Sequence, residues 1–226
     1  MQKVIGLDIG SYSIKAIEIV NTFKSYEVVN FYEVVIPNLE SVPLDAIVPI
    51  CMEQLFQEHN LQADRILTAM PGQFISSRVI PFGFNDPRKI AASIGIEIEE
   101  YVPFNMDDMI IDHQILGTAK GKTMALAVMT RKAFLRNFLD LLSRVNIDPK
   151  LVDVDSLAFY NLSPTLNIPD DECYALVDVG NEKTSVCIIK GGVLRMFRSI
   201  NLGGRYITDT AVPTAGTVRA VMDAAK

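Results

Sequence analysis

The chain has 226 residues, of which 49% are hydrophobic and 21% charged, and its formal net charge is −6. This balance is typical of a folded globular protein and excludes a disordered or fibrous chain. The length allows either one large domain or two small ones. The acidic balance disfavours binding to nucleic acid, because neutralising phosphate groups requires clustered lysine and arginine, and the sequence has no such cluster.

Other classes are disfavoured by what the sequence lacks. No apolar run approaches the ~20 residues of a membrane-spanning helix, and the first residues lack a signal-peptide pattern, so we expect no transmembrane segment and a location in the cytosol. Three cysteines without a C-x-x-C pair are typical of reduced thiols. With two histidines, neither near a cysteine, a protein-built zinc site and a histidine triad are both disfavoured.

The first part of the chain predicts strands followed by a helix and a further strand. Three runs rich in Val and Ile predict an antiparallel meander at residues 4–9, 13–20 and 26–36. Helical spacing of apolar residues predicts a helix over 44–58, and a strand follows at 65–70. We assign residues 1–81 to a first subdomain.

Residues 82–150 predict a small α+β unit inserted into the first. A strand reaches residue 82, and Asn85, Asp86 and Pro87 form a helix-start signal. Two strands around a turn at 117–122 and a long amphipathic helix over 131–145 complete the unit.

The inserted unit also carries an acidic run. Six carboxylates and no basic residue lie between Glu97 and Asp112. Such a run is most often a solvated surface, and a surface for a basic partner is the alternative.

The last part of the chain repeats the three-strand pattern of the start. Residues 151–171 form a connecting segment, which begins with a strand and a short helix. Three strands and the start of a helix at Gly203 and Gly204 fall within 172–210, which we assign to a partial second domain. Residues 211–226 form an atypical tail.

The repeated pattern includes a duplicated hairpin. Asp8-Ile9-Gly10-Ser11 reappears as Asp178-Val179-Gly180-Asn181. Each copy predicts a buried strand that ends in Asp, a Gly that permits a tight turn with positive φ, and small polar residues whose backbone N–H groups converge on an anion. A single copy is most simply a strand-ending turn, but two matched copies favour a phosphate clamp.

The residue types of the hairpins suit a magnesium-bound phosphate. Asp8 and Asp178 would hold a hydrated Mg²⁺ through its waters, because magnesium dehydrates reluctantly and is commonly held by one or two carboxylates plus phosphate oxygens. Lys15 would place a compact positive charge on the terminal phosphates. By offset its counterpart in the second copy is Ser185, which is uncharged.

Two such hairpins in this order resemble the actin superfamily, whose two domains close around ATP and Mg²⁺. The resemblance implies an α/β, actin-like (ribonuclease H-like) fold with duplicated sheet-and-helix domains. It implies that Asp155 lies near the attacking water as the candidate catalytic residue. It also implies that Gly203 and Gly204 let the backbone approach the nucleotide, beside the cofactor-binding residues already named, Gly10, Ser11, Gly180 and Asn181.

Within that superfamily the inserted unit resembles the PilM family, whose neighbours are FtsA and GspL. The segments that carry this resemblance are Tyr101-Val102-Pro103-Phe104 and Asp112-His113-Gln114. The resemblance implies a cytoplasmic scaffold of a type IV pilus or type II secretion assembly, peripheral at the inner face of the bacterial inner membrane. It would take the N-terminal peptide of a PilN-like inner-membrane protein in the groove between the first two subdomains.

The resemblance leaves three questions open. The family's further subdomain and Gly-rich adenosine motif are not found after Thr210, so we expect an incomplete second domain, weak ATP binding and at most weak ATPase activity. Apolar strands left uncovered there would favour self-association. The alternative functions are an FtsA-like filament former and, less well matched, a sugar or acetate kinase.

Overall fold

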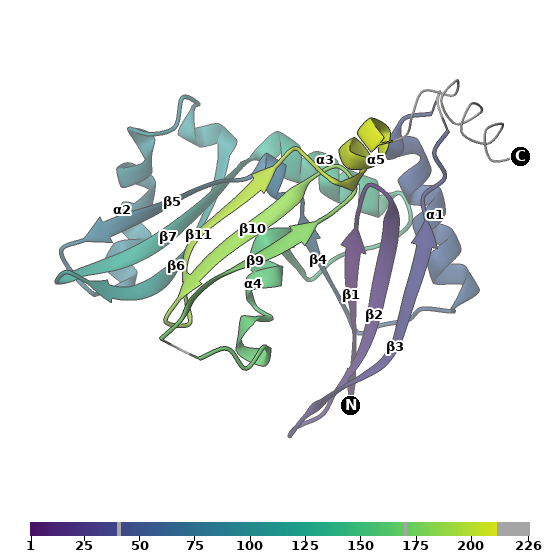
Figure 1. Ribbon diagram of the computed structural model, residues 1–226, viewed down its shortest axis with the longest axis horizontal. Coiled ribbons are helices and arrows are strands. Elements are labelled where there is room, and N and C mark those ends of the chain that lie inside the picture. The colour runs from purple at the N-terminus through teal and green to yellow at the C-terminus, as the bar shows by residue number, and fades with distance from the viewer. Residues whose placement is uncertain (40–41, 170, 212–226) are drawn as a thin grey trace, which may run out of the picture.

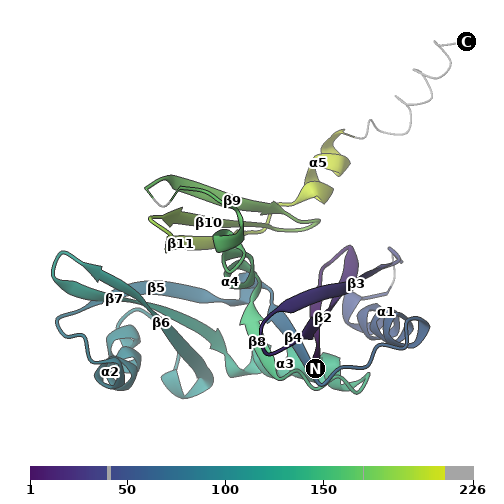
Figure 2. The same cartoon turned by 90° about the horizontal axis from the view of Figure 1, so that it is seen from below.

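The computed structural model describes residues 1–39, 42–169 and 171–211. Within these ranges the fold is a mixed α/β arrangement of three sheets with flanking helices (Figure 1). Figure 2 shows the third sheet lying across the other two, and α4 (Asp155–Tyr160) leads into it from β8 (Leu151–Val154). No helix among the described residues is long and apolar enough to cross a membrane.

The first sheet has the strand order β3-β2-β1-β4-β8. The first three strands form the predicted antiparallel meander, whereas β4 and β8 add in parallel. Helices α1 and α3 pack on one face, around the fully buried Ile5, Ile14, Met52 and Leu142. The elements are β1 (Gln2–Ile9), β2 (Ser13–Asn21), β3 (Tyr26–Val35), α1 (Leu44–Glu58), β4 (Arg65–Met70), α3 (Lys132–Ser143) and β8 (Leu151–Val154).

The second sheet has the order β5-β7-β6 and is antiparallel. One face packs against α2 through Ile90, Ile94 and Ile98, which lie on one helix face because they are four residues apart. The helix begins as predicted: the Asp86 carboxylate accepts from the backbone N–H groups of the second and third helical residues. The elements are η1 (Gly72–Phe74), β5 (Ser76–Phe82), α2 (Pro87–Glu99), η2 (Met106–Asp108), β6 (Met109–Ala119) and β7 (Lys122–Arg131).

The turn in this sheet lies within the predicted residues 117–122 but is shorter than predicted. Strand β6 continues through Gly117, which sits in a β-bulge with φ 120°, and the turn is made by Lys120 and Gly121, both with positive φ. A glycine in a strand can mark a bulge as well as a turn, and here it marks the bulge.

The third sheet has the order β11-β10-β9. Its inner face packs on the second sheet, where Cys187, Ile189 and Leu194 meet Leu126. On the outer face Val177 and Val179 are more than half exposed, so apolar surface stays open among the described residues. The elements are α4 (Asp155–Tyr160), η3 (Ser163–Thr165), β9 (Cys173–Val179), β10 (Thr184–Lys190), β11 (Val193–Ile200) and α5 (Gly204–Ala211).

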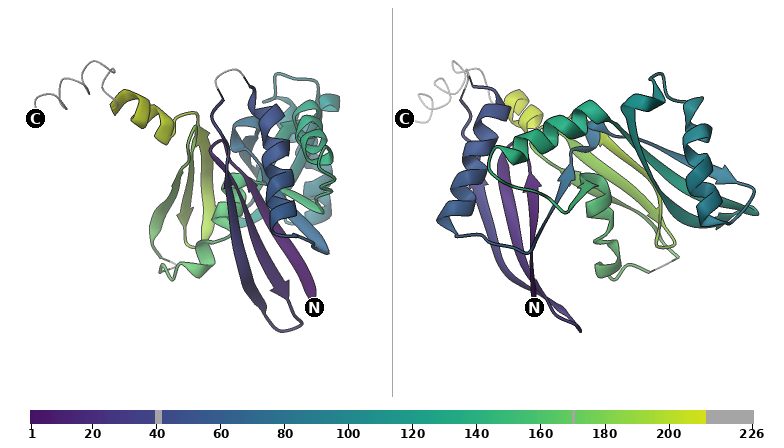
Figure 3. Two further views of the ribbon diagram at one scale, coloured as in Figure 1. Left: turned by 90° about the vertical axis from the view of Figure 1, so that its right-hand side faces the viewer. Right: turned by 180° about the vertical axis from the view of Figure 1, so that it is seen from behind.

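One face of the first sheet is covered by helices, and its other face is turned toward the third sheet. In Figure 3 the strands β1–β3 lie between α1 on one side and the third sheet on the other. The turns of both duplicated hairpins, at residues 10–12 and 180–183, therefore come from facing parts of the fold. The predicted tail at 211–226 lies almost wholly outside the described residues.

Candidate functional site

The two duplicated hairpins have the same turn geometry. The Gly10 N–H donates to the Ser13 carbonyl at 3.1 Å, and the Gly180 N–H donates to the Lys183 carbonyl at 2.9 Å. The strand registers also match, since Asp8 lies opposite Lys15 and Asp178 lies opposite Ser185. The sequence repeat is thus a repeat of backbone structure.

The reason predicted for the two glycines is wrong. Neither Gly10 nor Gly180 has a positive φ. A Cβ on Gly10 would lie 2.9 Å from the Ser13 carbonyl oxygen, and a Cβ on Gly180 would lie 3.0 Å from the Lys183 carbonyl oxygen. Glycine is required because a carbonyl oxygen from the same turn lies too close to the place of a Cβ. A left-handed backbone is not the reason.

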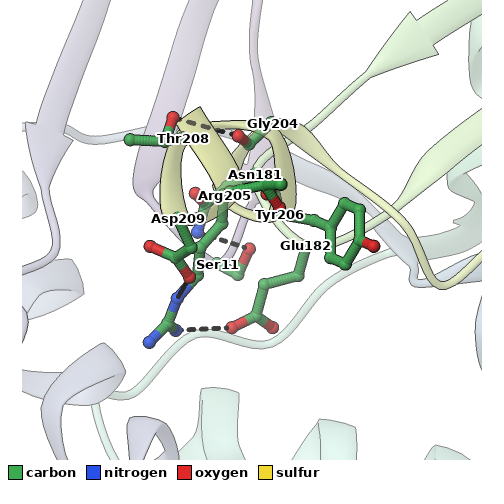
Figure 4. A network of polar contacts seen from close by, with 9 residues as sticks. Ser11, Asn181, Glu182, Gly204, Arg205, Tyr206, Thr208 and Asp209 are labelled. Carbon is green, nitrogen blue, oxygen red and sulfur yellow. Dashed lines mark hydrogen bonds and ion pairs between the residues drawn. The ribbon is translucent and has the colours of Figure 1, made fainter. Parts of the chain in front are cut away.

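The tips of the two turns meet. The Asn181 side-chain amide donates to the Ser11 hydroxyl at 3.4 Å, across the boundary between the first sheet and the third (Figure 4). Each of these side chains is only partly exposed. The contact brings the tips of the two hairpins together across this boundary.

The start of α5 is built onto the second hairpin. The Gly204 N–H donates to the Gly180 carbonyl at 2.8 Å, and the Arg205 N–H donates to the Asn181 carbonyl at 2.9 Å. Gly203 is buried against the same turn, where a Cβ would lie 2.3 Å from the Asn181 carbonyl oxygen. The predicted Gly203 and Gly204 therefore fix the hairpin to the helix by close backbone contact.

Charged side chains from several elements act on the Asp8 carboxyl. The pKa of the Asp8 carboxyl is raised, chiefly because the surrounding protein partly desolvates it, although part of this residue stays exposed to solvent. The positive charges of Lys15 and Lys183 lower this pKa, and the negative charges of Asp178 and Asp155 raise it further. Asp8 is therefore close enough to four charged groups from other elements to respond to each of them.

These side chains suit a magnesium ion held through water. Among the described residues, no three His, Cys, Asp or Glu side chains are grouped closely enough to hold a metal directly. Asp8 and Asp178 are two carboxylates of one charge cluster. Two carboxylates with phosphate oxygens and water are the ligand set that Mg²⁺ prefers, so the residues fit this cofactor.

A cavity of about 820 Å³ adjoins the hairpin tips. Ser11 and Asn181 line it together with residues of the segment after β3 and of α5. Its wall includes Arg205, which pairs with Glu182 at 3.4 Å and with Asp209 at 3.6 Å (Figure 4). The cavity is large enough for a nucleotide-sized ligand.

A second cavity, of about 300 Å³, lies between the first and second sheets. Its walls are mainly apolar, with Met70 and Val154 from the first sheet and Ile110 and Val128 from the second. The strands that flank it, β8 and β6, are both edge strands. The polar residues that line it are Asp112, His113, Gln114, Thr130 and Asp153.

Comparison with known protein families decides the relationship. A family model described as type IV pilus assembly protein PilM matches residues 6–219. The chain belongs to the PilM family. The family predicted from the sequence is thereby confirmed.

Solved structures place the fold in the actin-like group. The chain is similar to one in the "PilM-PilN type IV pilus biogenesis complex", with 19% identity and a TM-score of 0.76 over 91% of this chain and 63% of that one. It thus spans less than two thirds of that relative. The cytoplasmic domain of EpsL, an inner membrane component of the type II secretion system of Vibrio cholerae, matches with 13% identity and a TM-score of 0.58 (94% and 76% covered). A Bacteroides thetaiotaomicron protein with an actin-like ATPase fold and unknown function matches with 9% identity and a TM-score of 0.51 (92% and 76% covered).

The structure brings together most of the predicted site residues. Asp8, Lys15, Asp155 and Asp178 belong to one charge cluster, and the glycines shape the turns beside it. Asp155, the candidate catalytic residue, is already engaged: its carboxylate accepts from the Gly72 N–H at 3.0 Å and pairs with Lys183.

Lys183 was missed by the sequence analysis. The comparison of the two hairpins by offset placed the counterpart of Lys15 at Ser185, which is uncharged and buried. The cation of the second copy is instead Lys183, two residues earlier, where the turn itself presents the side chain. A search for any cation within the second hairpin would have found it.

Proposed function

We propose that this protein is an actin-like nucleotide-binding scaffold of a type IV pilus or type II secretion assembly. It holds ATP with Mg²⁺ between its duplicated hairpins and recruits the N-terminal peptide of a PilN-like inner-membrane protein. The observation that carries the proposal is the contact between Ser11 and Asn181, which sets the two matched turns face to face beside Asp8 and Asp178. Membership of the PilM family supports the assembly named.

The nucleotide part of the proposal follows from the roles of the hairpin residues. Asp8 and Asp178 orient the waters of a hydrated Mg²⁺, which neutralises the phosphates when bound. Lys15 adds a positive charge, and the buried Gly203 holds the start of α5 against the second hairpin. A ligand that contacts both hairpins stabilises one arrangement of the first and third sheets, which carry them. Because binding alone has this effect, the scaffold does not need to hydrolyse the nucleotide.

The peptide part of the proposal rests on the 300 Å³ cavity. An extended peptide can add to the free edge of β6 or β8 and place alternate apolar side chains among Ile110, Val128 and Val154. The similarity to EpsL, which is named as an inner membrane component, supports a position in the cytoplasm at the inner face of the bacterial inner membrane.

Replacing Ile110 with glutamate should weaken binding of the partner peptide by at least roughly tenfold, because a carboxylate in an apolar cavity must be desolvated when the peptide binds. Ile110 is 40% exposed and lines the cavity. Ile115 lies on the same strand, is 38% exposed and is not part of the cavity wall, so Ile115→Glu is the matched control. Fluorescence anisotropy with a labelled synthetic peptide of the PilN-like partner measures the effect, and equal losses in the two variants would contradict the assigned groove.

The acidic run offers a second, weaker contribution. Two cations from other strands stack on aromatic rings within this segment: Arg78 lies over the Tyr101 ring at 3.5 Å, and Arg131 lies over the Phe104 ring at 3.7 Å. Glu99 and Glu100, in contrast, are exposed and form no ion pair within the described part of the chain.

Replacing Glu99 and Glu100 with lysine should therefore weaken the binding of a basic partner peptide, most strongly at low salt. Nucleotide binding should stay unchanged. The double variant Glu53→Lys/Glu58→Lys on the exposed face of α1 makes the same change in net charge and serves as control. Peptide titration at two salt concentrations tests this prediction. An affinity that is unaltered in both variants removes the acidic surface from the mechanism.

A further inference from the structure

One ion pair connects the two halves of the site. The Lys183 ammonium group, in the turn between β9 and β10, contacts the carboxylate of Asp155, the first residue of α4. Their side chains are 25% and 20% exposed, so the pair is partly shielded from solvent. Water and salt screen such a pair less than a pair on the open surface.

The carboxylate side of this pair is fixed. Asp155 accepts from the Gly72 N–H at 3.0 Å and from the Ser156 hydroxyl at 3.0 Å, and Ser156 is fully buried. A Cβ on Gly72 would lie 2.8 Å from the Asp155 carboxylate, which leaves no room for another residue there. Asp155 therefore keeps hydrogen-bond donors even when Lys183 leaves.

Lys183 has a second anionic group nearby, the Asp8 carboxylate. Lys183 is near enough to Asp8 for its positive charge to be felt there, together with that of Lys15. The ammonium group thus contacts Asp155 and acts electrostatically on Asp8, the carboxylate proposed to stand at the phosphates. A lysine carries three donors on a flexible stem, so it can exchange one anionic partner for another by rotation of its own side chain.

An unpaired hydroxyl marks the same junction. The Ser199 Oγ is buried and has no hydrogen-bond partner among the described residues. Ser199 contacts the place where a Gly72 Cβ would lie, as the Asp155 carboxylate also does. Buried polar groups are rarely left unpaired in a native state, so this hydroxyl is a feature of the junction that the present contacts leave unexplained.

We propose that Lys183 is a second phosphate-binding cation, which Asp155 holds in the absence of ligand and which the terminal phosphates of a bound nucleotide take from it. The ion pair then acts as a latch between the third sheet and the start of α4. This inference rests on the proposed nucleotide site and adds a residue and a competition to it. It reassigns Asp155 from a candidate catalytic residue to a positioning residue that acts through Lys183.

The latch predicts effects of opposite sign. Asp155→Asn keeps one acceptor oxygen, for either Gly72 or Ser156, but no longer attracts Lys183 by charge, so it should raise the affinity for Mg²⁺-ATP a few-fold. Lys183→Gln removes a charge-assisted contact with the phosphates and should lower the affinity by roughly tenfold. Lys183→Arg should recover most of the loss. A purely structural ion pair predicts that Asp155→Asn and Lys183→Gln both lower the affinity.

Calorimetric titration of the wild-type protein and the three variants with ATP, and separately with inorganic tripolyphosphate, tests the latch. The second ligand shows whether phosphates alone compete for Lys183. Thermal unfolding of each variant checks that it is folded, and hydrogen exchange at residues 180–183 without ligand should be faster in Asp155→Asn. Binding by the wild type with shifts of equal sign, or no shifts, overturns the latch alone. Binding by Asp155→Asn but not the wild type supports it, and binding by neither overturns both the latch and the nucleotide site.

Discussion

Replacing Gly203 with alanine should destabilise the protein by about 3 kcal/mol, the upper end of the usual effect of overpacking. The added Cβ would lie 2.3 Å from the Asn181 carbonyl oxygen and 2.6 Å from that of Gly180. Both are backbone atoms, so neither can turn aside as a flexible side chain would. The second hairpin and the start of α5 must move apart, and nucleotide binding should be lost with them.

The neighbouring glycine provides the control. A Cβ on Gly204 would lie 3.6 Å from the Gly180 carbonyl oxygen, an ordinary contact. Gly204 is also the first residue of α5 and has no positive φ, so alanine can adopt its backbone conformation. Urea unfolding should therefore give a large loss of stability for Gly203→Ala and none for Gly204→Ala, and similar values for the two would contradict the packing described.

Replacing Asp8 or Asp178 with asparagine should reduce the affinity for Mg²⁺-ATP by roughly 10–100-fold, the usual effect of removing a group that acts on a metal through its first ligands. Each substitution keeps the size of the side chain but removes the charge that orients the magnesium waters. The loss should be smaller when magnesium is absent, because the carboxylates then repel the phosphates.

Asp148→Asn serves as the matched control, since the Asp148 side chain is 84% exposed and, within the described part of the chain, its ion pair is with Lys150 on the surface. Fluorescence titration with a labelled ATP analogue, with Mg²⁺ and with EDTA, measures both effects. If the Asp8 and Asp178 variants bind as the wild type does, the carboxylates have no role in holding the ion.

The parts of the fold that depend on neighbouring residues in the chain were predictable. The helix bounds of α1, the capping of α2 by Asp86 and the three-strand meander all follow from local patterns that tertiary packing leaves unchanged. The repeated Asp-x-Gly hairpins were also evident, because a repeat can be recognised without knowing how its copies are placed.

What the sequence could not provide depends on contacts between distant segments. Gly10 and Gly180 are glycines because a carbonyl group of the same turn lies where a Cβ would be. Turns of many different sequences can adopt such a geometry, so the sequence alone does not reveal it. The ion pair of Lys183 with Asp155 joins residues that belong to different elements, and no local pattern links them. The apolar cavity exists only because two sheets stand side by side, with Ile110 and Val154 on facing walls.

The central claim is that two duplicated hairpins from facing parts of the fold bind one nucleotide through magnesium. Calorimetric titration of the wild-type protein with ATP, in Mg²⁺ and again in EDTA, tests this most directly. We expect one ATP per chain in Mg²⁺ and much weaker binding in EDTA. The absence of binding in Mg²⁺, or binding of equal strength in EDTA, would contradict the claim.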